Sequence, residues 1–526
     1  MSAIVTDQFR IANANNFVES VLSADNNYYV FLGLSNPGTI SSPVGFGRST
    51  TWGEETNSNP PSPIDNQQYL SHYRNTALFG KKLTSSNIRR VIKKVNWTVN
   101  TRYDMYRHDY SVGNLTPISQ SARLYDSNYY VVNSDFKVYI CIYNGSHGSI
   151  GGTVNLTGNT SQDEPTFTDL EVSAAGTSGD EYLWKYLFTI SPSDIIKFDS
   201  TEYIVLPSDW STSNDFQIQS IRDSGDSTIN NNQIKYVYIE DGGGDGLYRS
   251  GTYNIKGDGS GAKVNIEVDT SGTIIKTTVV SGGSGYTFGI VDFGHATDDL
   301  IQNSSKLIPI IPPSRGHGYN IYEELGADKV LAYTRFDDST RDFPVNTKFS
   351  QVGIIKNPEK YNSSTLYSAS EYSSLGSIKL TSDITATIGN KIEQETSDGS
   401  IARGYIASYD ADTKVLKYYQ DRSLNFANTF DQTDRNDVTS KANVVSFESS
   451  SNSISDGTFS ASIDTGFGGI TTTIGSKIIN LGVTFSGGLA DPEINKNTGD
   501  VIYIDNRSLV TRDSRQKEDI KIILEF

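Results

Sequence analysis

The sequence predicts a mainly β protein, and three features of its composition favour that class. It contains 31 Tyr residues, and short segments rich in Val, Ile, Thr and Tyr recur along the chain; these residues suit pleated, half-buried surfaces. It also contains 46 Gly, with many Ser, Asn and Asp residues that supply the turns between strands. Only 36% of its residues are hydrophobic, a low share that leaves much of the chain for loops. We therefore expect a β-dominated fold with long connecting segments.

The length of 526 residues indicates roughly two to four domains. Shifts in composition place the boundaries, since Gly-rich and Ser/Asn-rich stretches alternate with more apolar ones. We expect a β-rich core with helices in residues 1–215, a Gly-rich β insertion in 216–300, a continuation of the core in 301–360, an inserted β domain in 361–495, and C-terminal strands that close the core in 496–526.

Two segments have the apolar spacing of an amphipathic helix, Asn13–Ser23 and Thr84–Val95. In the second, apolar residues recur at intervals of three and four, and the opposite face would carry Arg89, Arg90, Lys93 and Lys94. A third helix is expected to begin at Pro192, with Ser191 as its N-cap.

Strands are predicted wherever β-branched and aromatic residues dominate a short run. Such runs are Tyr28–Leu34, Thr101–Tyr106, Tyr129–Asn133, Lys137–Asn144, Glu181–Ile190, several pieces between residues 235 and 290, the segments GYIASYD and KVLKYYQ, and the final VIYIDNRSLV and DIKIILEF. The polar stretch Ser35–Pro63 is too hydrophilic to bury, so we expect a long loop that lies on the surface or on a partner.

The net charge of −17 restricts the partners of the protein. A surface this acidic repels phosphate backbones and anionic membranes, so nucleic acid and membrane surfaces are disfavoured. The four basic residues of Thr84–Val95 are then better interpreted as a solvated face, or a rim that meets an acidic neighbour, than as a nucleic-acid patch. No apolar run approaches the roughly 20 residues of a membrane span, and the first residues lack the order of a signal peptide. The single cysteine, Cys141, excludes an internal disulfide and is expected to lie in a core.

Motifs for catalysis or metal binding are missing from the sequence. The five histidines, His72, His108, His147, His295 and His317, have no metal-ligand spacing. His317, in RGHGYN, could serve as a general base or ligand, but a turn histidine with a local hydrogen bond is the favoured interpretation. No GxSxG elbow or calcium loop is present, and strand-like KVNIEV follows the glycines where a phosphate loop requires a helix. With 61 acidic residues a carboxylate pair carries no information. We expect no catalytic residue, metal, cofactor or small-molecule substrate.

Several segments, taken in order, resemble the dimeric baseplate wedge subunit of T-even-like contractile-tail phages, the gene-8 type. They are YYVFLGL (Tyr28–Leu34), IRRVIKKVNWTVNTRYDMY (Ile88–Tyr106), YYVVNSDFKVYICIYN (Tyr129–Asn144), DEYLWKYLFTIS (Asp180–Ser191), IPPSRGHGYNIYEELGADKVLAY (Ile311–Tyr333), FPVNTKFSQVGIIKNP (Phe343–Pro358) and the closing GDVIYIDNRSLVTRDSRQKEDIKIILEF. The departures, at about 216–300 and 361–495, are similar to insertions, as in a cyanophage-like relative.

The resemblance implies a two-layer, β-sandwich-like core of the α+β type, flanked by a few helices and carrying small inserted β domains. It implies a homodimer that contacts other baseplate wedge proteins, located in the virion tail baseplate and assembled in the host cytoplasm. Its role would be structural: linking neighbouring wedge proteins and taking part in assembly and in the rearrangement on contraction. We expect the basic face and the Ser35–Pro63 loop to contact other wedge subunits. Two alternatives stay open: a tail-fibre or spike adhesin that binds host surface glycans, and a virion-associated hydrolase of cell-wall or capsule polysaccharide.

Overall fold

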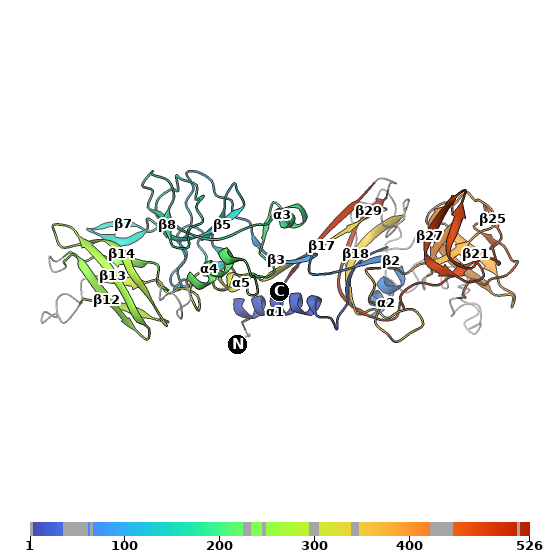
Figure 1. The fold of residues 1–526 in the computed structure, drawn as a ribbon, viewed down its shortest axis with the longest axis horizontal. Helices are drawn as coiled ribbons and strands as arrows, with labels where there is room; N and C mark the ends of the chain where they lie inside the picture. The colour runs from blue at the N-terminus through green and yellow to red at the C-terminus, as the bar shows by residue number, and fades with distance from the viewer. Residues whose placement is uncertain are drawn as a thin grey trace. The chain divides into compact units, whose positions relative to one another are not determined.

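The computed structural model describes residues 4–34, 62–63, 67–224, 233–244, 249–293, 305–337, 347–420, 445–512 and 516–526, without the side chains of 68, 69, 71 and 72. Strands far outweigh helices, which confirms the mainly β class (Figure 1). The chain forms two compact units. Unit 1 comprises the residues up to Val18, Arg89–Leu331 and Ile523–Phe526, and unit 2 comprises Glu19–Ile88 and Ala332–Ile522.

Unit 1 contains three four-stranded sheets, with the strand orders β4-β5-β9-β8, β16-β11-β6-β7 and β14-β13-β12-β15. Their strands are β4 (Tyr130–Val132), β5 (Lys137–Asn144), β6 (His147–Ile150), β7 (Thr153–Asn155), β8 (Ser173–Ala174), β9 (Tyr182–Thr189), β11 (Val237–Asp241), β12 (Gly251–Gly257), β13 (Ser260–Val268), β14 (Ile274–Ser284), β15 (Gly289–Asp292) and β16 (Lys306–Pro309). Its short helices are η1 (Leu124–Asp126), α3 (Pro192–Phe198), α4 (Phe216–Ser224) and α5 (Ile321–Glu324).

Unit 2 contains helix α2 (Gln67–Thr76) and three sheets, with the orders β19-β2-β1-β18-β29, β25-β24-β21-β22-β23-β20-β28 and β26-β27. Their strands are β1 (Tyr28–Gly33), β2 (Ala77–Lys82), β18 (Lys348–Lys356), β19 (Glu371–Ser373), β20 (Gly376–Lys379), β21 (Lys391–Glu395), β22 (Ile401–Asp410), β23 (Val415–Tyr419), β24 (Ile454–Ser455), β25 (Ser460–Ala461), β26 (Gly469–Ile474), β27 (Lys477–Phe485), β28 (Leu489–Ala490) and β29 (Asp500–Thr511).

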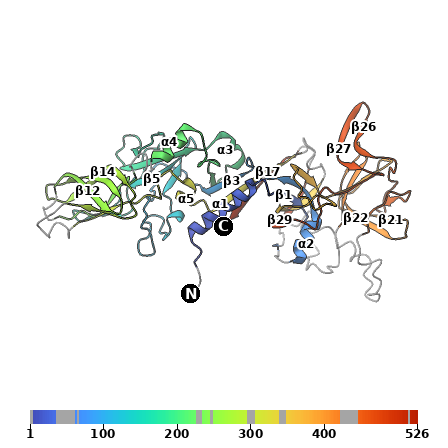
Figure 2. The ribbon, with the colours of Figure 1, turned by 60° about the horizontal axis from the view of Figure 1, so that its bottom comes forward.

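One further sheet, in the order β10-β3-β17-β30, and helix α1 (Asp7–Leu22) contain the points where the chain passes from one unit to the other. The strands of this sheet are β3 (Ile88–Lys93), β10 (Tyr203–Val205), β17 (Lys329–Phe336) and β30 (Glu518–Glu525). Figure 2 gives a second view of the same elements.

Most of the predicted elements are confirmed. The segments that the sequence assigned to α1, β1, β4, β5, β9, β22, β23, β29 and β30 all form those elements. Helix α3 begins at Pro192, and the Ser191 side chain accepts a hydrogen bond from the Asp194 backbone amide, as expected for an N-cap. The Ser35–Pro63 loop lies almost wholly outside the described residues.

The predicted helix Thr84–Val95 is wrong, because this segment contains strand β3. β3 pairs with β10 in antiparallel register, with Val91 opposite Val205. Nearly all of its side chains are at least partly buried, so both of its faces are covered. A short apolar run that is buried on both faces has no strict alternation, and its spacing then fits a helix equally well. The β-branched Ile and Val residues decide for the strand.

The predicted strand Thr101–Tyr106 is also wrong, apart from an isolated bridge between Thr101 and Ser161. The segment is irregular and is held by individual hydrogen bonds. The Tyr103 backbone amide donates to the Tyr182 hydroxyl at 3.0 Å, and the Tyr106 amide donates to the Cys141 carbonyl at 2.8 Å. Aromatic side chains therefore anchor a stretch that a sheet ladder does not include.

Aromatic rings gather in one part of the core of unit 1, around β5 and β9. Trp184 is fully buried, stacks on Tyr182 with ring centroids 5.3 Å apart, and meets the edge of Tyr103 at 5.8 Å. Cys141 lies opposite Trp184 in the β5–β9 pairing and is completely buried, as predicted. These offset and edge-on contacts add to the hydrophobic gain of burying the rings.

Many tyrosine hydroxyls in these cores donate to backbone carbonyl groups in loops or at the end of a helix. Donor–acceptor pairs are Tyr129 with Glu324 (2.6 Å), Tyr139 with Phe167 (2.6 Å), Tyr322 with Pro207 (2.6 Å) and, in unit 2, Tyr29 with Ala369 (2.8 Å). Each ring lies in a core while its hydroxyl satisfies a carbonyl that no strand or helix pairs. The abundance of Tyr in the sequence thus contributes to holding loops as well as to forming strands.

Candidate functional site

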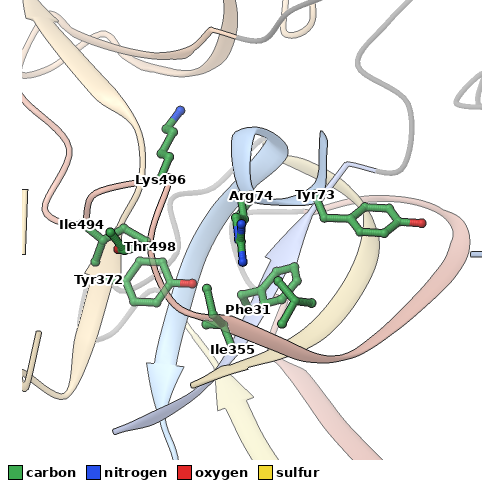
Figure 3. A pocket seen from close by; sticks show the side chains of 10 residues that line it. Phe31, Tyr73, Arg74, Ile355, Tyr372, Ile494, Lys496 and Thr498 are labelled. Carbon is green, nitrogen blue, oxygen red and sulfur yellow. The ribbon is translucent and has the colours of Figure 1, made fainter. Parts of the chain in front are cut away.

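A small cavity in unit 2 lies between β1, α2, β18 and the chain before β29 (Figure 3). Phe31 and Ile355 contribute apolar walls, while Arg74 and Tyr372 point toward its centre. The Arg74 guanidinium donates to the Gly499 carbonyl at 2.7 Å. Its Nε atom and the Tyr372 hydroxyl have no hydrogen-bond partner among the described residues. Two buried polar groups therefore face one small cavity.

The cavity holds about 10 Å³, which is room for a single water molecule. A bridging water between Arg74 and Tyr372 would satisfy both polar groups. Burial raises the pKa of the Tyr372 hydroxyl well above its ordinary value, so this group remains a neutral donor. No histidine, cysteine or carboxylate is among the residues that line the cavity. The arrangement can hold a structural water, but it has neither the volume nor the groups to convert a substrate.

His317 lies in a tight turn between two glycines with positive φ, Gly316 at 94° and Gly318 at 88°. Its side chain is buried, and Nδ1 lies 2.6 Å from Oε1 of the equally buried Glu324. The other Glu324 oxygen accepts from the Gly318 backbone amide at 2.7 Å. The local hydrogen bond that the sequence predicted for this histidine is therefore present. The Glu324 carboxylate connects the turn to helix α5.

Packing around this turn leaves it no access to a substrate. The Tyr106 ring meets the imidazole edge-on at 4.8 Å, and the Trp210 indole donates to the Gly318 carbonyl at 3.0 Å. Within the part of the chain that the structure describes, no group of three or more His, Cys, Asp or Glu residues is arranged to hold a metal ion. We therefore assign the His317–Glu324 pair a structural role.

The other histidines and the cysteine lie at separate places in the structure. His108 accepts a hydrogen bond from the Ile311 backbone amide at 3.1 Å, and its partial burial lowers its pKa. His147 is half-buried in β6. The His72 side chain and His295 lie outside the described residues. Burial raises the pKa of the Cys141 thiol well above its ordinary value, so it remains protonated and unreactive.

The basic residues predicted as one exposed helix face instead lie on strand β3 and, for Lys94, directly after it, and they are paired within the chain. Arg89 forms an ion pair with Asp194 at 3.0 Å, and Lys94 forms one with Asp199 at 2.8 Å. Arg90 is buried, and its guanidinium lies 4.2 Å above the Tyr322 ring. Lys93 is exposed and donates to the Asn128 side chain at 3.2 Å. The expectation that these four residues form one basic helix face is therefore wrong, while their contact with other wedge subunits stays a prediction.

The Gly-rich run forms strands and tight turns of the β14-β13-β12-β15 sheet. Gly283 has a φ of +58°, and a Cβ atom there would lie 2.5 Å from the Ala262 nitrogen and from the Ser260 oxygen. Glycine is required because two strand backbones approach closely. No helix follows these glycines, so the phosphate-binding alternative has no structural support.

Sequence reasoning missed a buried lysine in β9. The Lys185 side chain is fully buried, and its amino group donates to the Leu170 carbonyl at 2.7 Å and to the Ser224 hydroxyl at 3.0 Å. Burial, together with the nearby Lys235, lowers the Lys185 pKa to about 8. The only signal in the sequence is its position among the aromatic residues of EYLWKYLF, where a cation is unexpected.

The described structure is therefore that of a β-rich protein whose unusual polar groups stabilise its own turns and loops. None of the described helices is long and apolar enough to span a membrane. Residues 3–240 match the model of the family Phage-Gp8, described as Bacteriophage T4, Gp8. The match confirms the resemblance to the gene-8-type baseplate wedge subunit, which is a structural component of the phage tail baseplate. No curated protein gives a match to the chain.

The family match ends at residue 240, within β11. The segments at Ile311–Tyr333, Phe343–Pro358 and the C-terminus lie beyond it, so their resemblance to the family stays a prediction. The sheet built from β12 to β15 also lies beyond the match.

Proposed function

We propose that the protein links neighbouring wedge proteins in the baseplate of a contractile phage tail and takes part in assembly and in the rearrangement on contraction. The observation that carries this proposal is the family match over residues 3–240. We further propose that the subunit is a homodimer, that it is assembled in the host cytoplasm, and that it has no enzymatic activity.

The internal pairing of polar groups supports a structural role. Arg89, Lys94 and the buried Glu324 all bind partners within the chain, and the described cavity accommodates only a water molecule. Perturbed groups at an active site normally face a cleft that a substrate can enter. Here the perturbed groups, such as Lys185, hold loops to sheets.

Single apolar side chains on the surface of unit 1 are available for contacts with neighbours. Val112, Ile196 and Phe216 are 87%, 79% and 83% exposed, and each belongs to a different loop or helix. Isolated exposed apolar residues are ordinary on soluble proteins, so none defines an interface alone. Among the three, Phe216 is the best candidate for a contact, since aromatic residues are enriched at protein–protein interfaces.

We also propose that residues 216–300 and 361–495 are insertions into the core. In support, one four-stranded sheet is formed wholly by 251–292 and one seven-stranded sheet wholly by 376–490. Each sheet has its own cluster of buried apolar residues, centred on Val264 and Ile266 in the first and on Ile392 and Ile406 in the second. Modules contiguous in sequence can be added between strands of an existing fold.

The proposal is tested by co-expressing the chain with the other wedge proteins of the same phage and measuring assembly by sizing and light scattering. We expect the chain to enter a complex with at least one wedge protein and to release no sugar from host envelope. A chain that binds host cells, but joins no wedge complex, would instead support the adhesin alternative. Hydrolysis of purified host polysaccharide would support the hydrolase.

A further inference from the structure

The β26–β27 hairpin is the least covered sheet in the described part of unit 2. It is a two-stranded antiparallel ribbon closed by Gly475 and Ser476, and Figure 2 shows it standing clear of the neighbouring strands of its unit. Its base is anchored by Val483 and Phe485, which pack on Val415 and Ala490. The other side chains of the hairpin are mainly exposed, with Ile478 near the turn at 75% and Ile470 near the start of β26 at 41%.

Such a ribbon is poorly suited to remain alone in water. A two-stranded hairpin is marginally stable, and an open edge of high β-propensity invites pairing with another strand. Soluble proteins usually protect such edges with charges or proline. Residues 465–490 contain neither an acidic residue nor a proline, and Lys477 is their only charged residue. At the 20% charged content of the whole chain, about five charges would be expected there.

The two strands differ in their capacity to pair further. β27 is interrupted by an irregularity in its register and by Gly482, whose φ is +83°. β26 is a continuous run from Gly469 to Ile474, and β27 is its only partner among the described strands. Further pairing is therefore expected at the outer edge of β26.

The sequence of β26 is symmetric, because residues 470–474 read Ile-Thr-Thr-Thr-Ile. When two copies of this strand pair antiparallel about Thr472, each Ile faces an Ile, and each Thr faces a Thr. Residues directly opposite each other in an antiparallel pair lie on the same face and interact. A closed two-fold interface requires this self-complementarity.

The distribution of charge also favours a second copy of this chain as the partner of β26. Two chains of net charge −17 repel each other over most of their surfaces. The charge-free β26 edge lets two copies approach without placing like charges opposite each other. We propose that the β26 strands of two copies of this chain pair antiparallel across a two-fold axis at Thr472, joining two hairpins into a four-stranded sheet. This inference rests on the proposed homodimer and locates a contact within it.

A cysteine at the symmetry axis tests the pairing directly. Opposite Cα atoms in an antiparallel pair are about 4.5 to 5.5 Å apart, within reach of a disulfide. Thr472→Cys should therefore give a covalent dimer on mild oxidation, and the buried Cys141 does not compete. Thr252→Cys is the matched control, since Thr252 is exposed on β12, whose two edges are already paired with β13 and β15. Equal cross-linking of the two variants, or none in Thr472→Cys, would overturn the inference.

Charge substitution gives an independent test. In Thr471→Glu/Thr473→Glu, carboxylates of the two copies lie opposite each other, so the dimer dissociation constant measured by analytical ultracentrifugation should rise at least tenfold. Mixing this variant with Thr471→Lys/Thr473→Lys should restore a dimer that contains one copy of each. The control Thr252→Glu/Asn254→Glu has the same spacing on a paired strand and should dimerise normally. An unchanged constant in the Glu variant would refute the β26 contact.

The same variants separate this inference from the proposed function. If the Glu variant remains dimeric but no longer joins the wedge proteins, β26 binds a different protein, and the inference fails while the wedge role stands. If the wild-type chain joins no wedge complex, the proposed function fails whatever the state of β26. A monomeric wild-type chain at micromolar concentration would overturn both the homodimer and the β26 pairing.

Discussion

Arg512 Nε donates to Glu518 Oε2 at 2.8 Å, and the two side chains are 0% and 7% exposed. The pair lies at the end of β29 and the start of β30, and the Arg512 guanidinium also donates to the Gln516 carbonyl at 2.9 Å. A cation buried this deeply depends on its partner, because removing one member of a buried pair leaves an uncompensated charge.

Glu518→Gln should therefore destabilise unit 2 by about 3 kcal/mol. Asp519→Asn, one residue further, is the matched control: the Arg335–Asp519 pair is exposed at 46% and 44%, and its loss should cost about 0.5 kcal/mol. Hydrogen exchange of the β29 and β30 amides in rising denaturant measures both changes. Equal effects of the two substitutions would show that burial of the Arg512 pair has no energetic importance.

Lys185 should make the stability of unit 1 rise with pH above neutrality. Its pKa is about 8 in the folded chain and about 10.5 in the unfolded chain, so between these values the unfolded state binds more protons and folding is favoured as pH rises. From pH 7.5 to 9.5 the free energy of unfolding of the wild type should gain about 1 to 2 kcal/mol relative to Lys185→Met. Urea unfolding followed by Trp184 and Trp210 fluorescence measures this difference. Lys93→Met, at an exposed lysine, should behave as the wild type.

Protonation of His108 should lower the free energy of unfolding as the pH falls. Partial burial lowers its folded pKa, so the unfolded state takes up a proton first as pH falls through about 6.5, and folding is then disfavoured. The protonated ring also loses its acceptor for the Ile311 amide. The wild type should lose roughly 0.5 kcal/mol more than His108→Gln between pH 7.5 and 5.5. An NMR titration that gave His108 a pKa above 6.5 would contradict the expected direction.

Gly283→Ala should destabilise the β12–β15 sheet through both backbone strain and crowding. Its φ of +58° disfavours any side chain, and the new Cβ would meet the Ala262 and Ser260 backbone at 2.5 Å. Gly151→Ala isolates the cost of backbone strain from the cost of crowding. Gly151 has a similar φ of +55°, and no atom lies within 4 Å of the added Cβ. We expect a loss of about 1 kcal/mol for Gly151→Ala and at least about 2 kcal/mol for Gly283→Ala in thermal unfolding.

The sequence predicted elements best where one local signal dominated. Helix α3 was located by the Ser191–Pro192 start, and β5 by an unbroken run of β-branched and aromatic residues. β3 was predicted wrongly because its two covered faces erase the alternation that marks a strand. Arg90 added to the error, since its burial depends on the Tyr322 ring, more than 200 residues away in the chain.

The candidate site was predictable only in part. The local pairing of His317 could be inferred from its flanking glycines and nearby acidic residues, and its partner Glu324 lies only seven residues away. The partners of Lys185 could not be inferred from the sequence. Leu170 lies in a loop and Ser224 in a helix, and only tertiary packing brings them next to Lys185. The pairing of Arg89 with Asp194 was likewise invisible, and it turned an apparent contact surface into an internal ion pair.

The tyrosine hydroxyl contacts bear on how the protein would transmit force if, as proposed, it takes part in the rearrangement of the baseplate. Each ring has only two side-chain torsions and is wedged in a core, so the carbonyl that its hydroxyl binds is fixed to that core by a short, stiff connection. A pull on the loop at Phe167 or at Pro207 is then passed to the core strands and helices before the loop can extend. Irregular segments attached in this way are held to the core at fixed points and would move with it, although they contain no regular secondary structure.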